Sequence, residues 1–453
     1  MSKNETFNYV QLVFIHLIIG LAIFFVPVVS KIYAILIILV GYRYVILRKN
    51  ANNEALYVAA YLVAAEVFLR MTEGNFFEQF AKYGVIGILI IGMFYRGFSK
   101  NAVLYWVFGL LLIPGVMVSF FTLNFETDIR KAITFNIIGP VTLAICAIYC
   151  YERRMTYKQM ISLLDTFTYP LMATLVYMFL YTPSIKDVVT NTESNFETSG
   201  GFGPNQVSTI LGFGIFLFFV KIVLNSKTTI IRYINILFFI VITFRGIVTF
   251  SRGGIITGFV MIIVVVLLIL WYTKSHAKTK VIGLVVFGVF SLVGIWLYSS
   301  VQTSGLIDKR YANQDARGRE KVSKLTGRER LIASEFKMFL DNPVLGIGVG
   351  KNKEYRLETT GVDAASHNEI TRMLAEHGLF GLLALVILLF TPFFLYLNNR
   401  QNIFVISFLV FWLLTINHAA MRLAAPAFVY ALSLLKVNFI DENETSLSRE
   451  SAV

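Results

Sequence analysis

Charge and cysteine are scarce in this sequence. Only 15% of its 453 residues are Asp, Glu, Lys or Arg, while 57% are hydrophobic. Soluble domains carry about 25% charged residues, so the composition excludes an ordinary soluble protein and indicates a membrane protein. The only two cysteines, Cys146 and Cys150, lie one turn apart in an apolar segment. Helix packing is the expected reason for them there, rather than a disulfide or a metal site.

Other absences narrow the class of protein. There is no internal repeat, and the first apolar segment lacks an A-x-A cleavage site, which favours a retained membrane anchor over a removed signal peptide. No interleaved aromatic and basic motif accompanies the net charge of +13, so we expect no nucleic-acid partner. The glycine-rich residues 346–350 do not follow a predicted strand, which excludes a dinucleotide-binding loop.

Apolar segments of membrane-crossing length recur along the chain. A helix needs about 20 residues to cross a bilayer, and about fourteen segments approach that length. They lie near residues 10–29, 32–47, 55–69, 83–95, 102–121, 133–151, 160–181, 206–224, 233–250, 253–272, 281–299, 373–397, 402–417 and 421–438. Because several are short, we predict an all-α polytopic membrane protein with about 12–14 transmembrane helices and one large extracytoplasmic loop, residues 301–371, containing a short helix.

Lysine and arginine gather in alternate loops, which predicts the orientation of the chain. Short cytoplasmic loops are enriched in these residues. With both termini inside, the cytoplasmic loops collect Arg43, Arg48, Lys49, Arg96, Lys100, Arg153, Arg154, Lys158, Lys221, Lys227, Arg232, Lys274, Lys278, Lys280 and Arg400. The 301–371 loop then lies outside despite its cations, because long loops cross the membrane largely regardless of charge. Much of the positive net charge therefore reflects the orientation of the chain in the membrane.

Residues 326–329 of the outer loop (Thr-Gly-Arg-Glu) have the form of a capping box. They predict a helix that runs to about Leu340 and is ended by Asn342-Pro343. Leu331, Ile332, Phe336 and Phe339 should form its buried stripe. Arg328 precedes Ile332 by four residues, so it should point at the protein body.

A second capping box, residues 366–369 (Ser-His-Asn-Glu), places His367 in the first turn of another helix. The positive end of the helix dipole disfavours imidazolium, so we expect a neutral His367 that can accept a proton. The same helix end should offer free backbone N–H groups to an anion such as phosphate.

Three further polar positions fall at the outer ends of apolar segments. Arg252, within residues 249–254 (Thr-Phe-Ser-Arg-Gly-Gly), is flanked by glycines that permit close backbone approach. Arg422 also reaches the outer face. Residues 200–206 (Gly-Gly-Phe-Gly-Pro-Asn-Gln) form a turn that includes Asn205.

In this order, these segments resemble the O-antigen ligase and polymerase family, membrane glycosyltransferases that take glycan from an undecaprenyl diphosphate carrier. The resemblance covers about residues 195–400. It rests on the turn at 200–206, Ser251-Arg252-Gly253, Gly327-Arg328, residues 342–348 (Asn-Pro-Val-Leu-Gly-Ile-Gly), and His367-Asn368 followed by residues 374–378 (Leu-Ala-Glu-His-Gly). Glu197 and Thr198 depart from the pattern, because the family commonly has an arginine near this position. That departure weakens the turn at 200–206 as a phosphate site.

The resemblance implies a metal-independent, GT-C-like transfer of a sugar chain that needs no cofactor. His367 would be the catalytic base, because the attacking sugar hydroxyl must lose its proton. Arg252 and Arg328 would bind the diphosphate, whose leaving charge guanidinium groups can stabilise. Arg330, Arg422, Asn205 and Asn368 are secondary candidates. The structural alternatives are a helix-start residue for His367 and an ion pair or membrane anchor for each arginine.

We therefore expect an enzyme of the bacterial inner membrane with its active site on the periplasmic face. It would polymerise lipid-linked glycan or, as a ligase, pass it to a lipid A core; a protein acceptor is a third variant. Residues 1–205 would be N-terminal transmembrane helices, 206–440 the ligase- and polymerase-like core, and 441–453 a cytoplasmic tail. The alternative is a flippase or transporter of the same glycan, but transporters tend to place charges at the midplane and show repeats.

Overall fold

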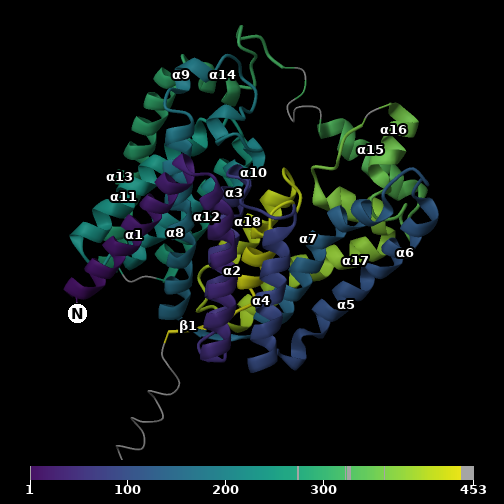
Figure 1. Cartoon of the computed structure of the whole chain (residues 1–453), viewed down its shortest axis with the longest axis horizontal. Helices are drawn as coiled ribbons and strands as arrows, with labels where there is room; N and C mark the ends of the chain where they lie inside the picture. Colours follow the sequence, from purple (N-terminus) through teal and green to yellow (C-terminus); the bar gives the residue numbers. More distant parts are fainter. Residues whose placement is uncertain (1, 273–274, 322, 324–327, 362, 440–453) are drawn as a thin grey trace, which may run out of the picture.

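The computed structural model describes residues 2–272, 275–321, 323, 328–361 and 363–439 (Figure 1). Helices make up nearly all of the regular structure in these residues. The α-helices are α1 (Ser2–Phe25), α2 (Val28–Arg48), α3 (Glu54–Met71), α4 (Phe80–Arg96), α5 (Val103–Leu111), α6 (Ile113–Thr122), α7 (Ile129–Cys150), α8 (Tyr157–Tyr181), α9 (Ile185–Val188), α10 (Pro204–Val220), α11 (Thr229–Ile247), α12 (Arg252–Tyr272), α13 (Ser275–Gln302), α14 (Leu306–Tyr311), α15 (Arg328–Asp341), α16 (Lys351–Thr360), α17 (Glu369–Asn398), α18 (Val405–Ile416) and α19 (Ala425–Leu432).

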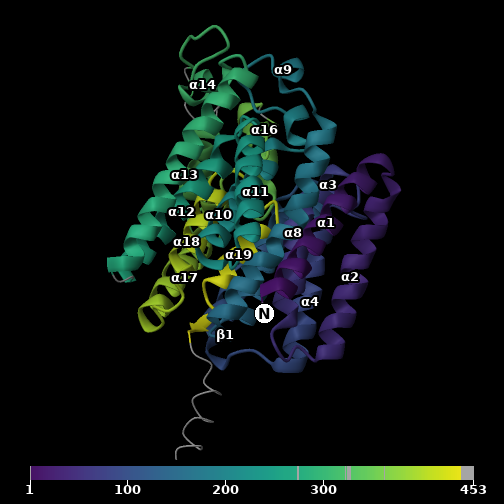
Figure 2. The same ribbon diagram turned by 90° about the vertical axis from the view of Figure 1, so that its left-hand side faces the viewer.

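The shorter elements join these helices. Two are 3₁₀ turns, η1 (Lys100–Ala102) and η2 (Glu197–Ser199), and η3 (Lys221–Asn225) is a π-helical turn after α10. Strands β1 (Arg154–Thr156) and β2 (Lys436–Asn438) pair in parallel, with Met155 opposite Val437. Figures 1 and 2 place β1 at one end of the molecule and α9, α14 and α16 at the other.

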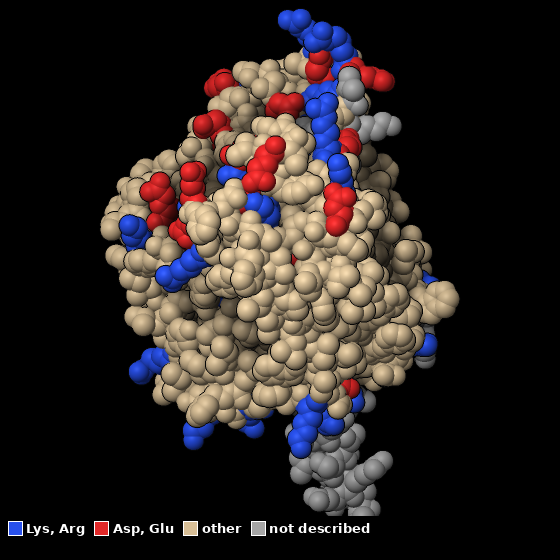
Figure 3. Space-filling view, turned by 90° about the vertical axis from the view of Figure 1, so that its right-hand side faces the viewer, with Lys and Arg blue, Asp and Glu red and all other residues tan. Residues whose placement is uncertain are grey.

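The all-α polytopic architecture is confirmed. Among the described residues, ten helical segments are long and apolar enough to cross a membrane. Every predicted apolar segment contains helix, but α18 has 12 residues and α19 only 8. Figure 3 shows a broad belt almost free of charged side chains, with both signs of charge above it and mainly Lys and Arg below it. An uncharged belt of this kind is the surface that lipid tails would cover.

Helix α10 forms the centre of the bundle. Of the residues in its membrane-spanning part, 89% are buried, the highest share among the ten segments. This is expected for a helix that is apolar on all sides. Glycines allow α12 to lie directly against it. A Cβ added to Gly212 would lie 1.9 Å from the carbonyl oxygen of Gly254. This close backbone approach fixes the end of α12 at which Arg252 begins the helix.

Helix α17 is broken at Gly378, which has φ 57° and ψ −132°. The chain after α15 packs into the break: the N–H of Leu379 donates to the Pro343 carbonyl (2.7 Å) and that of Ile347 to the Ala375 carbonyl (2.9 Å). Gly346 is also required there, because a Cβ on it would lie 2.5 Å from the Glu376 backbone. The glycines of the 342–348 and 374–378 motifs therefore hold two distant chain segments together.

The predicted outer-loop helix exists as α15, ending at Asp341. Thr326 and Gly327, its expected start, lie outside the described residues, as does the tail 441–453. Only part of the predicted stripe faces inward: Leu331, Ile332 and Phe339 are half-buried and Phe336 is 48% exposed, whereas Glu335 and Met338 are fully buried. The buried face of α15 differs from the predicted one because Glu335 points inward and accepts hydrogen bonds from polar partners on α16 and α17.

Candidate functional site

Three arginines meet in one hollow at the end of the bundle where α14 and α15 lie. We call it the arginine cavity. Its volume is about 440 Å³, and it is lined by Asn205, Ser251, Arg252, Gly253, Ile256, Thr257, Arg310, Arg328, Ile332, Leu414, Asn417 and His418. The structure thus brings three of the sequence-predicted residues, Asn205, Arg252 and Arg328, together from α10, α12 and α15. As expected, Arg328 faces the protein body beside Ile332.

The turn between α11 and α12 builds one wall of the arginine cavity. Phe250 has φ 59°, a left-handed conformation that is costly for a bulky residue. Its carbonyl oxygen accepts a hydrogen bond from Arg310 Nε (2.9 Å). The next residue, Ser251, donates from Oγ to Asn205 Oδ1 (2.8 Å). Gly253 then allows the ring of His418 to approach, since an added Cβ would lie 2.7 Å from it.

The electrostatics of this cavity favour an anion. No carboxylate is among its described lining residues. Burial lowers the pKa of Arg310, and the positive charge of Arg252 lowers it further. Burial likewise lowers the pKa of Arg328, followed by the charges of Arg422 and Arg252. The guanidinium groups are therefore close enough to repel one another, and a bound anion such as a diphosphate would relieve that repulsion.

His367 lies immediately before α17, not inside its first turn. The N-cap is Asn368, whose Oδ1 accepts from the N–H groups of Ile370 (2.9 Å) and Thr371 (3.2 Å). The prediction of a Ser366 cap is wrong, because the Ser366 hydroxyl donates to Glu335 instead. Asn368 already occupies two of the free N–H groups at this helix end, so fewer remain for the expected anion, and that site stays a prediction.

His367 is held in one neutral tautomer. Its Nδ1 lies 3.0 Å from the Ala365 carbonyl oxygen, which can only accept, so Nδ1 carries the hydrogen and Nε2 keeps a lone pair. Burial, followed by the positive charges of Arg422 and Arg328, lowers the pKa of His367 to about 4. The imidazole is neutral near pH 7, as expected, but burial and arginines cause this rather than the helix dipole.

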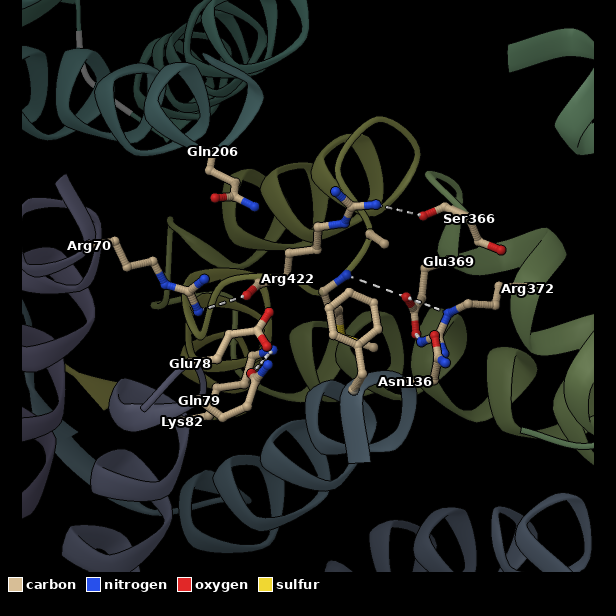
Figure 4. A pocket seen from close by; sticks show the side chains of 13 residues that line it. Arg70, Glu78, Gln79, Lys82, Asn136, Gln206, Ser366, Glu369, Arg372 and Arg422 are labelled. Carbon is tan, nitrogen blue, oxygen red and sulfur yellow. Dashed lines mark hydrogen bonds and ion pairs between the residues drawn. The ribbon is translucent and has the colours of Figure 1, made fainter. Parts of the chain in front are cut away.

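Arg422 lines a small second hollow, which we call the Arg422 cavity and which reaches Ser366, the residue before His367 (Figure 4). Its volume is about 100 Å³, and its lining comprises Arg70, Glu78, Gln79, Lys82, Phe135, Asn136, Gln206, Ser366, Glu369, Arg372, Ala420, Met421 and Arg422. Arg422 Nη2 donates to the Ser366 carbonyl (3.2 Å), and the Arg422 carbonyl accepts from Arg70 Nη2 (3.4 Å). Helices α3, α4 and α7, which the resemblance does not cover, thus contribute to the walls of a cavity that reaches Ser366, the residue before His367.

A buried ionic cluster fixes the His367 segment. Glu335 of α15 is 1% exposed. It accepts from Ser366 Oγ and from Thr371 Oγ1, and it pairs with Arg356 (3.0 Å). Arg328 lies two turns earlier on the same helix. Helix α15 therefore carries a cation of the arginine cavity and also anchors both sides of His367, so it sets the position of one relative to the other.

Not every candidate reaches the site. Arg330 is exposed and lines none of the cavities described here. Asn368 acts as the cap, and its Nδ2 donates to Asn417 Oδ1 (2.9 Å) in the wall of the arginine cavity. Sequence reasoning missed Arg310, which is only 7% exposed. It also missed Arg372, although the spacing of Glu369, Arg372 and Glu376 places all three on one helix face, which is an available signal.

Comparison with known protein families supports the resemblance. The family model described as O-antigen ligase matches residues 236–386. This stretch runs from α11 to the first half of α17 and contains Arg252, Arg310, Arg328 and His367, whereas Asn205 and Arg422 lie outside it. No curated protein matches the chain. The predicted resemblance to the O-antigen ligase and polymerase family is thus confirmed, and it indicates a membrane function of that general type.

Proposed function

We propose that this chain is a membrane glycosyltransferase that moves an oligosaccharide from undecaprenyl diphosphate to an acceptor hydroxyl on the periplasmic face of the bacterial inner membrane. The observation that carries the proposal is the juxtaposition of a neutral His367 with a cavity of three guanidinium groups. The charge of Arg328, which lines that cavity, and the charge of Arg422 both lower the pKa of His367, and this supports a base close to the anion site. The positive-inside loops and the belt in Figure 3 support the orientation.

In this mechanism Arg252, Arg310 and Arg328 hold the diphosphate. His367 Nε2 removes the proton from the acceptor hydroxyl, and the hydroxyl oxygen bonds to the anomeric carbon. The bond from that carbon to the diphosphate oxygen breaks, and the electron pair leaves with the diphosphate. The guanidinium groups stabilise that charge, which gives a route without a metal ion. The bound diphosphate would also offset the arginine charges that lower the pKa of His367, so donor binding would strengthen the base.

Polymerisation is the form of the reaction that we favour, with ligation to a lipid A core and transfer to protein as alternatives at the same site. A flippase is the contrasting class. A flippase should have a cationic cavity accessible near the midplane. Here the arginine cavity lies near the ends of α12 and α18, beside α14 and α15, and this arrangement favours the transferase.

The test uses purified protein in lipid nanodiscs with a lipid-linked oligosaccharide as both donor and acceptor. We expect release of undecaprenyl diphosphate and a longer glycan, with chelator present and no nucleotide added. Replacing His367 by Ala should stop the release without changing the thermal unfolding profile. Movement of the lipid-linked glycan across vesicle membranes without any glycan transfer would overturn the proposal in favour of the flippase.

A further inference from the structure

A third hollow lies beyond His367, and its chemistry differs from that of the arginine cavity. We call it the outer groove. It has a volume of about 510 Å³, and its walls come from the first half of α7, from α16 and from residues 363–366. This volume falls within the range of about 300–1,000 Å³ that is usual for small-molecule sites. The groove shares Phe135, Asn136 and Ser366 with the Arg422 cavity, so it continues toward the His367 segment.

The charges of the outer groove are balanced. Asp128 Oδ1 accepts from the N–H of Lys131 (2.9 Å), and Asp363 pairs with Lys353 (3.0 Å). Glu354 pairs with Lys351 at the rim (2.8 Å). Because these carboxylates have cationic or backbone partners, the groove presents no strong field of either sign. The lining holds carboxylates together with Lys131, Lys353 and Arg356, so a phosphorylated ligand would meet carboxylates that the arginine cavity lacks, whereas an uncharged ligand would not be repelled.

One buried polar group in this groove lacks a partner. Asn352 is 3% exposed and lines the groove, and its Oδ1 makes no hydrogen bond within the described part of the chain. A buried carbonyl oxygen without a donor costs free energy, and a ligand hydroxyl would remove that cost. The neighbouring Asn136 side chain and the apolar surfaces of Phe135 and Leu357 complete a lining that suits sugar hydroxyls and C–H faces.

The groove is also placed to deliver a hydroxyl to the base. Ala365 and Ser366 line it, and His367 follows directly with its Nδ1 bonded to the Ala365 carbonyl. Arg328 and Asn417, by contrast, approach the His367 segment from the arginine cavity. The His367 segment thus has an anion site on one approach and a charge-balanced polar groove on the other, which is the arrangement that a two-substrate transfer needs.

We infer that the outer groove is the acceptor site and that it takes the uncharged, hydroxyl-rich saccharide part of the acceptor, with Asn352 Oδ1 accepting from one of its hydroxyl groups. This inference rests on the proposed function. The acceptor oxygen gains the bond to the anomeric carbon, the diphosphate leaves with the electron pair of the broken bond, and the acceptor proton passes to His367. Asn352 sets acceptor affinity and does not touch the diphosphate.

The test measures KM separately for donor and acceptor in nanodiscs. The donor is the lipid-linked oligosaccharide, and the acceptors are the same oligosaccharide freed from its lipid and its singly phosphorylated form. Asn352→Ala should raise the acceptor KM about three- to tenfold, the loss expected for one hydrogen bond, and leave the donor KM within twofold. Leu357→Trp, at a 52% exposed position of the groove, should raise it without touching the buried cluster. Arg330→Ala is the matched control.

Each outcome decides the inference. An unchanged acceptor KM in both groove variants would overturn the groove as the acceptor site. A lower KM for the phosphorylated acceptor than for the uncharged one would overturn the charge class. If the wild-type protein releases no undecaprenyl diphosphate with any acceptor, the proposed function itself fails and the inference falls with it. Normal release with unaltered acceptor kinetics in the variants overturns the inference alone.

Discussion

The arginine cavity and the outer groove lie on either side of His367 and differ in the chemistry of their walls. The first has three guanidinium groups and no carboxylate among its described lining residues, whereas the second contains carboxylates with cationic or backbone partners. Both are of similar volume, about 440 and 510 Å³. The two cavities therefore differ in charge rather than in size, and under the proposed function each could be disabled without the other.

Removing the base should have the largest effect, because His367 serves both cavities. We expect His367→Ala to lower kcat by about 10²–10⁴-fold, the usual contribution of general base catalysis. The measurement is the initial rate of undecaprenyl diphosphate release, with circular dichroism and thermal unfolding as controls of folding. A rate within tenfold of wild type would remove His367 from the role of base.

Substitutions in the arginine cavity should weaken the donor side only. Arg328→Ala and Arg310→Ala should each reduce kcat/KM for the donor by about 10–100-fold, since a charge-assisted hydrogen bond contributes about 1.5–3 kcal/mol. Arg328→Lys should restore only part of this loss, because lysine lacks the bidentate fork. Arg330→Ala, two residues away on the exposed side of α15, should stay within twofold. Equal losses at Arg328 and Arg330 would contradict the cavity assignment.

The pH dependence of kcat/KM tests how the neighbouring arginines affect His367. The pKa of His367 is lowered to about 4, so kcat/KM should be flat near neutral pH and fall only as the imidazole is protonated close to that value. Arg422→Gln removes a positive charge, so it should move this acid limb upward, toward the ordinary histidine pKa of about 6.5. A pH profile of kcat/KM for both proteins tests this. An acid limb that stays in place would exclude Arg422 as a cause.

The smallest expected effect concerns the support of His367. Asn368→Ala removes the α17 cap and its bond to Asn417, and it should cost about 1 kcal/mol of stability, the usual value for an N-cap. Asn368→Asp, which retains a capping oxygen, is the matched control and should recover most of this loss. Thermal unfolding in nanodiscs provides the measurement, and a stable Asn368→Ala variant would contradict the assigned cap.

Sequence patterns predicted the helices well and the site in part. Apolar length located the membrane segments, and the i, i+4 spacing of Arg328 and Ile332 correctly oriented Arg328. Periodicity could not identify Arg310, because Lys309, Arg317 and Arg319 are cations in the same polar loop. Only the fold shows that Arg310 is the one that binds the Phe250 carbonyl. Local pattern also chose the wrong cap before α17.

The reason for the wrong cap is a contact distant in sequence. Ser366 and Asn368 both have suitable side chains, but Glu335, 31 residues before Ser366, binds the Ser366 hydroxyl. The same carboxylate rotates α15 away from its expected stripe. A single buried acid on an otherwise ordinary helix therefore decides two features that hydrophobic pattern alone predicts incorrectly.

The most direct test of the account is an electron cryomicroscopy map of the protein in nanodiscs with bound lipid-linked oligosaccharide, using the His367→Ala variant to prevent turnover. We predict diphosphate density in contact with Arg252, Arg310 and Arg328, with the first sugar directed toward position 367 and the outer groove. Diphosphate density in the outer groove, or at the end of the bundle that carries β1 and β2, would contradict it.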